Sequence, residues 1–266
     1  MRATHMLELP LVHLREQVGQ CAPGDFATVF GRLLEEYARR QGRPRWGEKS
    51  PYSYRWAKDM MKWFPAATFV HIIRDPRDVA ASLRDVRFTD GLHYWFTTSP
   101  AVVGLEWRES TNVAEQLQKS CPSRYRALRY EDLVTQPEET VRALCKFVDE
   151  EFLPEILDVT NRLPFGDSNS SFEQLQGISR NPIGRGRERL GPAELWWLER
   201  FAGSGLGRWG YDATRTGWTL EAGLRTPTVA LQASMFGLLR TARSLAPACF
   251  ERQAVLTPAS DETKPS

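Results

Sequence analysis

The sequence has few of the features that mark metal-binding, secreted or membrane-spanning proteins. Its four cysteines are scattered with no Cys-x-x-Cys pair, and its four histidines show no metal-ligand spacing, so neither a disulfide framework nor a metal site is expected. No uninterrupted apolar run approaches the roughly 18 residues of a membrane span. The N-terminus lacks the charged-then-apolar layout of a signal peptide. These absences predict reduced thiols and a cytoplasmic protein without a transmembrane segment.

The chain also has no large excess of positive or negative charge. The 266 residues carry a formal net charge of +2, which gives no case for a nucleic-acid partner through bulk electrostatics. A bound anion would therefore need a local basic cluster. Charged residues make up 26% and hydrophobic residues 41% of the chain, as in ordinary globular proteins. The length is that of one large domain, or of a domain with a tail, and is sufficient to bury a full core.

The stretch from Ala67 to Leu83 predicts a strand, a tight turn and a helix. Residues 68–73 are a short apolar run rich in β-branched side chains, which is typical of a buried parallel strand. Asp75 is suited to cap the following helix and Pro76 to occupy its first turn. Apolar residues then recur at helical spacing. Ligands of open α/β sheets bind outside the carboxyl ends of strands, so this turn is the first candidate binding site.

Two side chains near this turn are suited to hold a phosphate group. Arg74 leaves the end of the strand, and Ser82 lies two helical turns further on. An arginine fork and a hydroxyl can together bind a phosphate. The alternative is that Arg74 pairs with Asp75 or Asp78, and that Ser82 is only a small residue at a helix–sheet contact.

The segment Phe69-Val-His-Ile-Ile-Arg-Asp-Pro-Arg-Asp-Val-Ala-Ala-Ser-Leu83 resembles the 3′-phosphate-binding segment of sulfotransferases. These enzymes use 3′-phosphoadenosine 5′-phosphosulfate (PAPS). In that family the strand-end arginine and the helix serine contact the 3′-phosphate of the donor, so the resemblance assigns this role to Arg74 and Ser82. A second similar segment begins Tyr125-Arg-Ala-Leu-Arg-Tyr-Glu-Asp-Leu-Val134. It implies a structural role, as a sheet strand with its covering helix.

A third similar segment is Trp46-Gly-Glu-Lys-Ser-Pro51, which matches a Gly-Glu-Lys-Thr/Ser-Pro pattern of many bacterial sulfotransferases. Residues 45–47 are expected to form a short strand. By the resemblance, Lys49 reaches the donor sulfonate or the substrate, because a compact ammonium suits a transferring anionic group. Glu48 would orient Lys49 or act on the acceptor. The alternative is that Glu48 and Lys49 are only a solvated Glu-Lys pair at the end of that strand.

Residues 179–190 concentrate four arginines around two glycines. Glycines let a backbone close round an anion, and arginines neutralise it. The run resembles the family's Gly-Arg-Trp-Arg segment, which covers the 3′-phosphate end of the nucleotide, and this makes Arg185 and Arg187 candidates for that contact. Gly186 replaces the usual tryptophan, so any stacking by that ring would be missing. The alternative is a mobile basic loop.

The family's 5′-phosphosulfate loop, of the type Arg/Lys-Ser-Gly-Thr-Thr, has no counterpart before Lys49. In the family that loop grips the sulfate-bearing phosphate through backbone N–H groups and the helix dipole. Three explanations stay open: a start codon placed too far downstream, a truncated inactive relative, or a strand supplied by another chain of a homo-oligomer. In several relatives a glutamate shortly after the loop's helix is the acceptor's general base, and Glu8 is the candidate for that position.

The remaining pattern predicts further elements. Helices are expected over the amphipathic or apolar stretches 25–41, 54–64, 100–119, 192–203 and 229–245, and from 137 onward. A strand is expected over 124–130, loops over 87–100 and 162–191, and a disordered tail over 258–266.

Together these patterns predict an α/β fold, a three-layer P-loop-type parallel sheet with helices on both faces, lacking the first strand and phosphate loop. Residues 1–212 would be the sulfotransferase-like domain and 213–266 a C-terminal helix and tail. The resemblance implies transfer of a sulfonate group from PAPS to a hydroxyl or amine of a small-molecule, glycan or lipid acceptor, without a metal. The alternative is a non-catalytic relative that binds nucleotide or a protein partner. A P-loop kinase is disfavoured because the sequence has no Gly-Lys-Ser/Thr loop.

Overall fold

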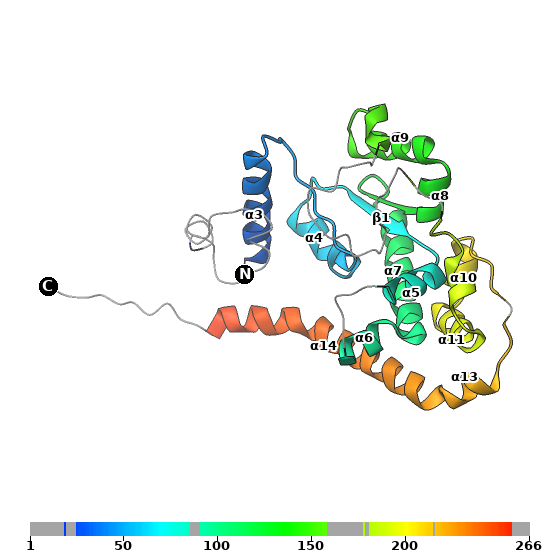
Figure 1. Cartoon of the computed structure of the whole chain (residues 1–266). Helices are drawn as coiled ribbons and strands as arrows, with labels where there is room; N and C mark the ends of the chain where they lie inside the picture. Colours follow the sequence, from blue (N-terminus) through cyan, green and yellow to red (C-terminus); the bar gives the residue numbers. More distant parts are fainter. Residues whose placement is uncertain are drawn as a thin grey trace. The chain divides into compact units, whose positions relative to one another are not determined.

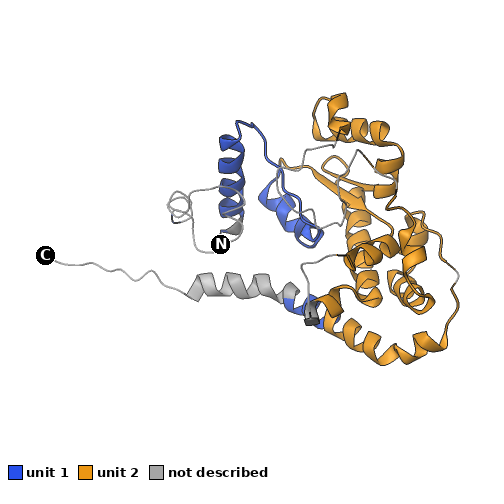
Figure 2. Cartoon of the chain, viewed as in Figure 1, with its two compact units in different colours: residues 1–65, 237–266 blue, residues 66–236 orange. Residues whose placement is uncertain are grey.

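The chain forms two compact units. The computed structural model describes residues 19, 25–85, 91–158, 178, 181–214 and 216–256 (Figure 1). Unit 1 comprises residues 1–65 and 237–266, and unit 2 comprises residues 66–236 (Figure 2). Glu8, most of the predicted loop over 162–191 and the predicted tail over 258–266 lie outside the described residues.

Unit 1 is helical in its described residues. Helix α3 (Phe26–Arg40) begins where the sequence predicts, because the Asp25 carboxylate caps it and accepts a hydrogen bond from the Thr28 backbone N–H at 3.0 Å. The helix predicted over 54–64 is confirmed as a short 3₁₀ turn, η1 (Ser53–Trp56), followed by α4 (Ala57–Trp63).

The strand predicted over residues 45–47 is wrong. These residues have no regular secondary structure, and the sheet of the described chain contains no partner strand for them. Trp46 instead packs edge-on against Phe30 and Phe64, with ring centroids 6.3 and 5.4 Å away. The segment is therefore held by ring packing within unit 1 rather than by a hydrogen-bonded ladder.

Unit 2 contains two parallel strands. Strand β1 (Phe69–Ile73) pairs with β2 (Tyr125–Arg129) in a register that runs from Phe69↔Tyr125 to Ile73↔Arg129. Both strands therefore end at the same edge of the sheet. The chain between them is helical, as a crossover between parallel strands requires.

The two faces of β1 differ in burial. On one face, His71 lies between β2 and a helix, with its ring nitrogens 2.5 Å from the Tyr125 hydroxyl and 2.9 Å from the Ser110 hydroxyl. On the other face, Val70 and Ile72 are 42% and 48% exposed. The strand is therefore buried on one face, whereas its continuous apolar run predicts burial on both.

Helices account for the rest of unit 2. They are α5 (Pro76–Leu83), α6 (Gly91–Thr97), α7 (Pro100–Ser120), α8 (Tyr130–Thr135), α9 (Pro137–Val148), η2 (Pro154–Leu157), α10 (Arg185–Arg189), α11 (Pro192–Ala202), α12 (Gly205–Arg208), α13 (Leu220–Leu224) and α14 (Thr226–Leu256), which continues into unit 1. The predicted loop over 87–100 is wrong where α6 lies. The Trp95 carbonyl in α6 accepts a hydrogen bond from Gln232 in α14, a partner 137 positions away that no local pattern indicates.

The core of unit 2 joins α5, α7 and α11. Its buried members are Ala80, Val103, Leu190, Leu195 and Leu198. Helices α7 and α11 approach closely at Gly104, where a Cβ atom would lie only 2.6 Å from the Leu198 carbonyl oxygen. The predicted α/β class is confirmed, and the core places α5 so that its first turn begins at the carboxyl end of β1 (Figure 1).

Candidate functional site

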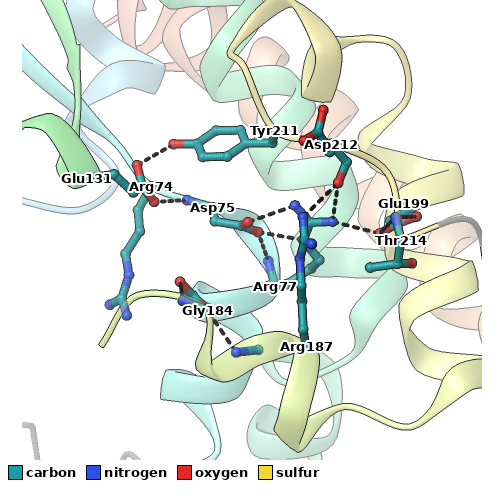
Figure 3. Close-up of polar contacts among 12 residues, drawn as sticks. Arg74, Asp75, Arg77, Glu131, Gly184, Arg187, Glu199, Tyr211, Asp212 and Thr214 are labelled. Atoms are coloured by element: carbon teal, nitrogen blue, oxygen red, sulfur yellow. Dashed lines mark hydrogen bonds and ion pairs between the residues drawn. The ribbon is translucent and has the colours of Figure 1, made fainter. Parts of the chain in front are cut away.

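The turn after β1 has the predicted local geometry. Asp75 caps α5, with its carboxylate accepting a hydrogen bond from the Arg77 backbone N–H at 2.9 Å, and Pro76 occupies the first helical position. The Arg74 side chain points away from the Asp75–Arg77 pair (Figure 3).

Arg74 carries a buried hydrogen-bond donor without a partner in the described part of the chain. Its Nη2 donates to the Pro182 carbonyl at 2.8 Å, and its guanidinium lies 4.8 Å from the centre of the Tyr130 ring. Its Nε is buried and has no hydrogen-bond partner among the described residues. Neither Asp75 nor Asp78 makes the salt bridge that the alternative interpretation of Arg74 requires, because both carboxylates bind other groups.

Asp78 attaches the arginine-rich segment 179–190 to α5. Its carboxylate accepts hydrogen bonds from the backbone N–H groups of Gly184 and Gly186 at 2.9 and 2.7 Å. Burial raises the pKa of Asp78, and these two donors oppose that shift. Gly184 has a left-handed backbone (φ 82°) and begins α10. Residues 185–189 are thus a helix fixed to α5, where the sequence predicts a loop.

Gly186 is where α10 touches α5. A Cβ atom at this position would lie 2.2 Å from the Arg77 carbonyl carbon and 2.3 Å from its oxygen. These are backbone atoms in the first turn of α5, so they cannot move aside as a flexible side chain can. The close approach therefore leaves room only for glycine at this position.

The arginines of α10 point to different partners. Arg189 binds the Asp85 carboxylate through both terminal nitrogens at 2.6 and 2.7 Å. Hydrogen bonding from Arg189 lowers the pKa of Asp85, and the nearby charge of Arg185 adds to the effect. Arg187 instead donates to the Asp212 carbonyl at 3.0 Å (Figure 3). Arg185 and Arg187 were both predicted to contact the 3′-phosphate. The charge of Arg185 acts on Asp85, just after α5, whereas Arg187 binds the backbone at residue 212.

Ser82 lies on the same face of α5 as Asp78, one turn further on. It is half-buried, and its hydroxyl makes no hydrogen bond to any residue that the structure describes. Hydrogen bonds to the Pro182 carbonyl and to Asp78 thus tie the segment 182–186 to Arg74 and to α5, the helix that carries Ser82.

The most buried charge of this region, Arg77, was not among the predicted site residues. Arg77 is 0% exposed and binds three groups: the Asp75 carboxylate at 2.7 and 2.8 Å, the Glu199 carboxylate at 2.9 Å, and the Asp212 carbonyl at 2.7 Å (Figure 3). Burial acts against ionisation, but the two carboxylates outweigh it and raise the pKa of Arg77. Glu199 is 122 positions away, so no local signal could have identified it.

The predicted catalytic residues that the structure describes belong to unit 1. The Glu48 carboxylate accepts a hydrogen bond from the Ser53 hydroxyl at 3.1 Å. Lys49 is exposed, and it forms no ion pair with Glu48 or with another described residue. Both side chains are exposed, which the alternative interpretation of a solvated Glu-Lys pair also expects.

Two classes of feature are absent from the described part of the chain. It contains no group of three or more His, Cys, Asp or Glu side chains placed to hold a metal ion. Among the same residues, no helix has the length and apolar character needed to cross a membrane.

Comparison with known proteins identifies the family. A model of the sulfotransferase family matches residues 4–154, whereas no curated protein matches the chain. Among solved structures, the sulfotransferase domain from the Synechococcus PCC 7002 olefin synthase is 22% identical, with a TM-score of 0.53 over 79% of this chain and 74% of that one. The sulfotransferase domain from the curacin biosynthetic pathway is 19% identical, with a TM-score of 0.48 over 70% of this chain and 68% of that one. Since the family match spans more than half of its length, this chain belongs to the sulfotransferase family.

Proposed function

We propose that the protein transfers a sulfonate group from PAPS to a hydroxyl or amine of a small-molecule, glycan or lipid acceptor. The observation that carries this proposal is a hydrogen-bond donor of Arg74 that is buried without a partner. It stands at the carboxyl end of β1 with a buried Nε–H that has no partner in the described structure. A buried donor without a partner costs free energy, so the position favours an anionic ligand that can accept from it.

The neighbouring groups fit a phosphate. Ser82 offers a hydroxyl that no described residue uses, and Arg185 adds positive charge near the end of the same helix. Arg74 and Ser82 would hold the 3′-phosphate of PAPS, with Arg185 neutralising it. Arg187 would contribute less, because one of its donors already binds the Asp212 carbonyl.

The reaction would need two further roles. When bound, PAPS supplies an activated sulfonate, whose bond to the phosphate oxygen breaks as the acceptor oxygen or nitrogen bonds to sulfur in line. Lys49, which makes no ion pair in the described structure, would stabilise the charge on the transferring group. A carboxylate would take the acceptor's proton, with Glu8 or Glu48 as candidates.

Calorimetric titration tests the donor site directly. The intact chain is titrated with adenosine 3′,5′-bisphosphate and, as the matched ligand without the 3′-phosphate, adenosine 5′-monophosphate. We expect micromolar binding that depends on the 3′-phosphate. Arg74→Ala and Ser82→Ala should each weaken bisphosphate binding, by roughly 10- to 100-fold for the arginine, because charged hydrogen bonds contribute about 1.5–3 kcal/mol.

The control variant is Arg142→Ala, which removes an exposed arginine of α9 and should leave both affinities unchanged. Equal affinity for the two nucleotides would contradict the 3′-phosphate assignment. A folded chain that binds neither nucleotide would instead favour the non-catalytic relative that binds a protein partner. Release of labelled sulfonate from PAPS to an added acceptor then tests transfer itself.

A further inference from the structure

The peptide group that joins Arg74 to Asp75 is held at both of its polar atoms by buried side chains. The Trp107 indole N–H donates to the Arg74 carbonyl oxygen at 2.9 Å. The Asp75 backbone N–H donates to the Glu131 carboxylate at 3.0 Å. Trp107 and Glu131 are only 7% and 8% exposed. This peptide cannot rotate without breaking two buried hydrogen bonds.

Trp107 and Glu131 are themselves held in place by other buried residues. The Tyr211 hydroxyl donates to the second oxygen of the Glu131 carboxylate at 2.7 Å (Figure 3). The Tyr211 ring also packs edge-on against Trp107, with centroids 6.1 Å apart. The indole lies so close to Gly205 that a Cβ atom there would be 2.9 Å from it. Tyr211 therefore contacts both Trp107 and Glu131.

This peptide lies directly after the last paired residue of β1, so holding it also fixes the backbone of Arg74. The residue before Arg74, Ile73, is paired with Arg129 in the sheet ladder, so the backbone of Arg74 is fixed by the sheet on one side and by Trp107 and Glu131 on the other. The direction in which the Arg74 side chain leaves the backbone is thereby set. A catalytic or binding group that is misplaced by about 1 Å loses much of its effect, so groups of this kind need rigid support.

We propose that Trp107 and Glu131 are positioning residues that fix Arg74 for contact with the 3′-phosphate of the nucleotide. This inference rests on the proposed function. Neither residue needs to touch the ligand. Their effect acts through Arg74, and it should therefore appear only for ligands that carry the phosphate that Arg74 binds.

Trp107→Phe tests the inference, because it removes the indole N–H and keeps an aromatic ring. The matched control is Trp197→Phe in α11, where the indole N–H likewise donates to a backbone carbonyl, that of Ala222, at 3.1 Å. Each variant is titrated with adenosine 3′,5′-bisphosphate and adenosine 5′-monophosphate, and its folding is checked by thermal denaturation. We expect Trp107→Phe to weaken bisphosphate binding about tenfold, with monophosphate binding unchanged, and Trp197→Phe to change neither affinity.

Tyr211→Phe provides a second route if Trp107→Phe does not fold. It removes one hydroxyl, frees the Glu131 carboxylate to shift, and should also weaken bisphosphate binding selectively. A double-mutant cycle with Arg74→Ala completes the test, because neither variant should have a further effect once Arg74 is absent.

Three outcomes would overturn the inference. Equal losses for both nucleotides would show a general structural role, and an effect that persists in the Arg74→Ala background would show that Arg74 is not the mediator. Unchanged bisphosphate affinity in Trp107→Phe and Tyr211→Phe would show that the peptide needs no such support. If the unaltered chain binds no bisphosphate, the proposed function fails as well, and this result is separate from the other three.

Discussion

The buried guanidinium of Arg77 leads to a sharp prediction about stability. Arg77→Met keeps much of the side chain's volume and removes its charge and all of its side-chain hydrogen bonds. The carboxylates of Asp75 and Glu199, each about 13% exposed, would then lie without their partner. Breaking a buried ion pair by removing one member costs about 3–5 kcal/mol, because the remaining charge is left uncompensated.

That cost is a large fraction of the 5–15 kcal/mol that usually separates folded and unfolded proteins. For a chain of this size it corresponds to a fall in Tm of about 6–20 °C. The measurement is urea and thermal unfolding, followed by circular dichroism. The control is Arg142→Met, which breaks an ion pair of the same 2.7 Å length to Glu138 on the exposed face of α9. We expect that variant to lose only about 1 kcal/mol, including its contact with the Phe152 ring.

A second substitution separates the loss of charge pairing from the loss of packing. Glu199→Gln, added to Arg77→Met, neutralises one of the two carboxylates that lose their cation and should recover part of the lost stability. The reasoning would be refuted if Arg77→Met cost no more than Arg142→Met. It would also fail if the two changes at positions 77 and 199 were simply additive, since the residues contact each other.

Two further predictions concern unit 2. Gly186→Ala should lower the free energy of unfolding by about 1–3 kcal/mol in urea titrations, because its methyl group would meet the Arg77 backbone. The control is Gly207→Ala in α12, where the new methyl group would lie in open space and should cause no measurable loss of stability. Equal effects of the two substitutions would contradict the close approach at Gly186. Burial lowers the pKa of His71 to about 4, below the value of about 6.5 expected in the unfolded chain. Stability should therefore be full above pH 6.5 and fall by up to about 1.4 kcal/mol per pH unit as the pH drops towards 4. His71→Asn should reduce the slope of the unfolding free energy against pH between pH 4 and 6.5. An unchanged slope would show that His71 is not the group responsible.

Local order in this protein follows from local sequence. The strand, turn and helix around Arg74 form as predicted because Asp75 caps the helix and Pro76 has the backbone angle of a first helical turn. The same signals placed α3, α7 and α11 within one or two residues. The resemblance of three short segments to sulfotransferases also pointed to the family that the comparison later established.

The two wrong predictions of secondary structure have a common cause. Residues 45–47 were predicted as a strand, but a strand exists only where a neighbouring chain segment supplies its hydrogen bonds. Helix α6 was predicted as a loop, although a contact from Gln232 in α14 holds its last turn. In both cases the deciding partner lies far away in the sequence.

The sequence by itself singled out Arg74 and Ser82 as candidates for a phosphate site, because an arginine at a strand end and a serine two helical turns on are local features. The tertiary structure alone decided how Arg74 is held. Trp107 and Glu131 meet its peptide group from two other elements, and the glycines at 184 and 186 dock on Asp78 from 106 and 108 positions away. Hydrogen bonds across such separations leave no periodicity and no spacing in the chain, since they depend on where packing of the core places each helix.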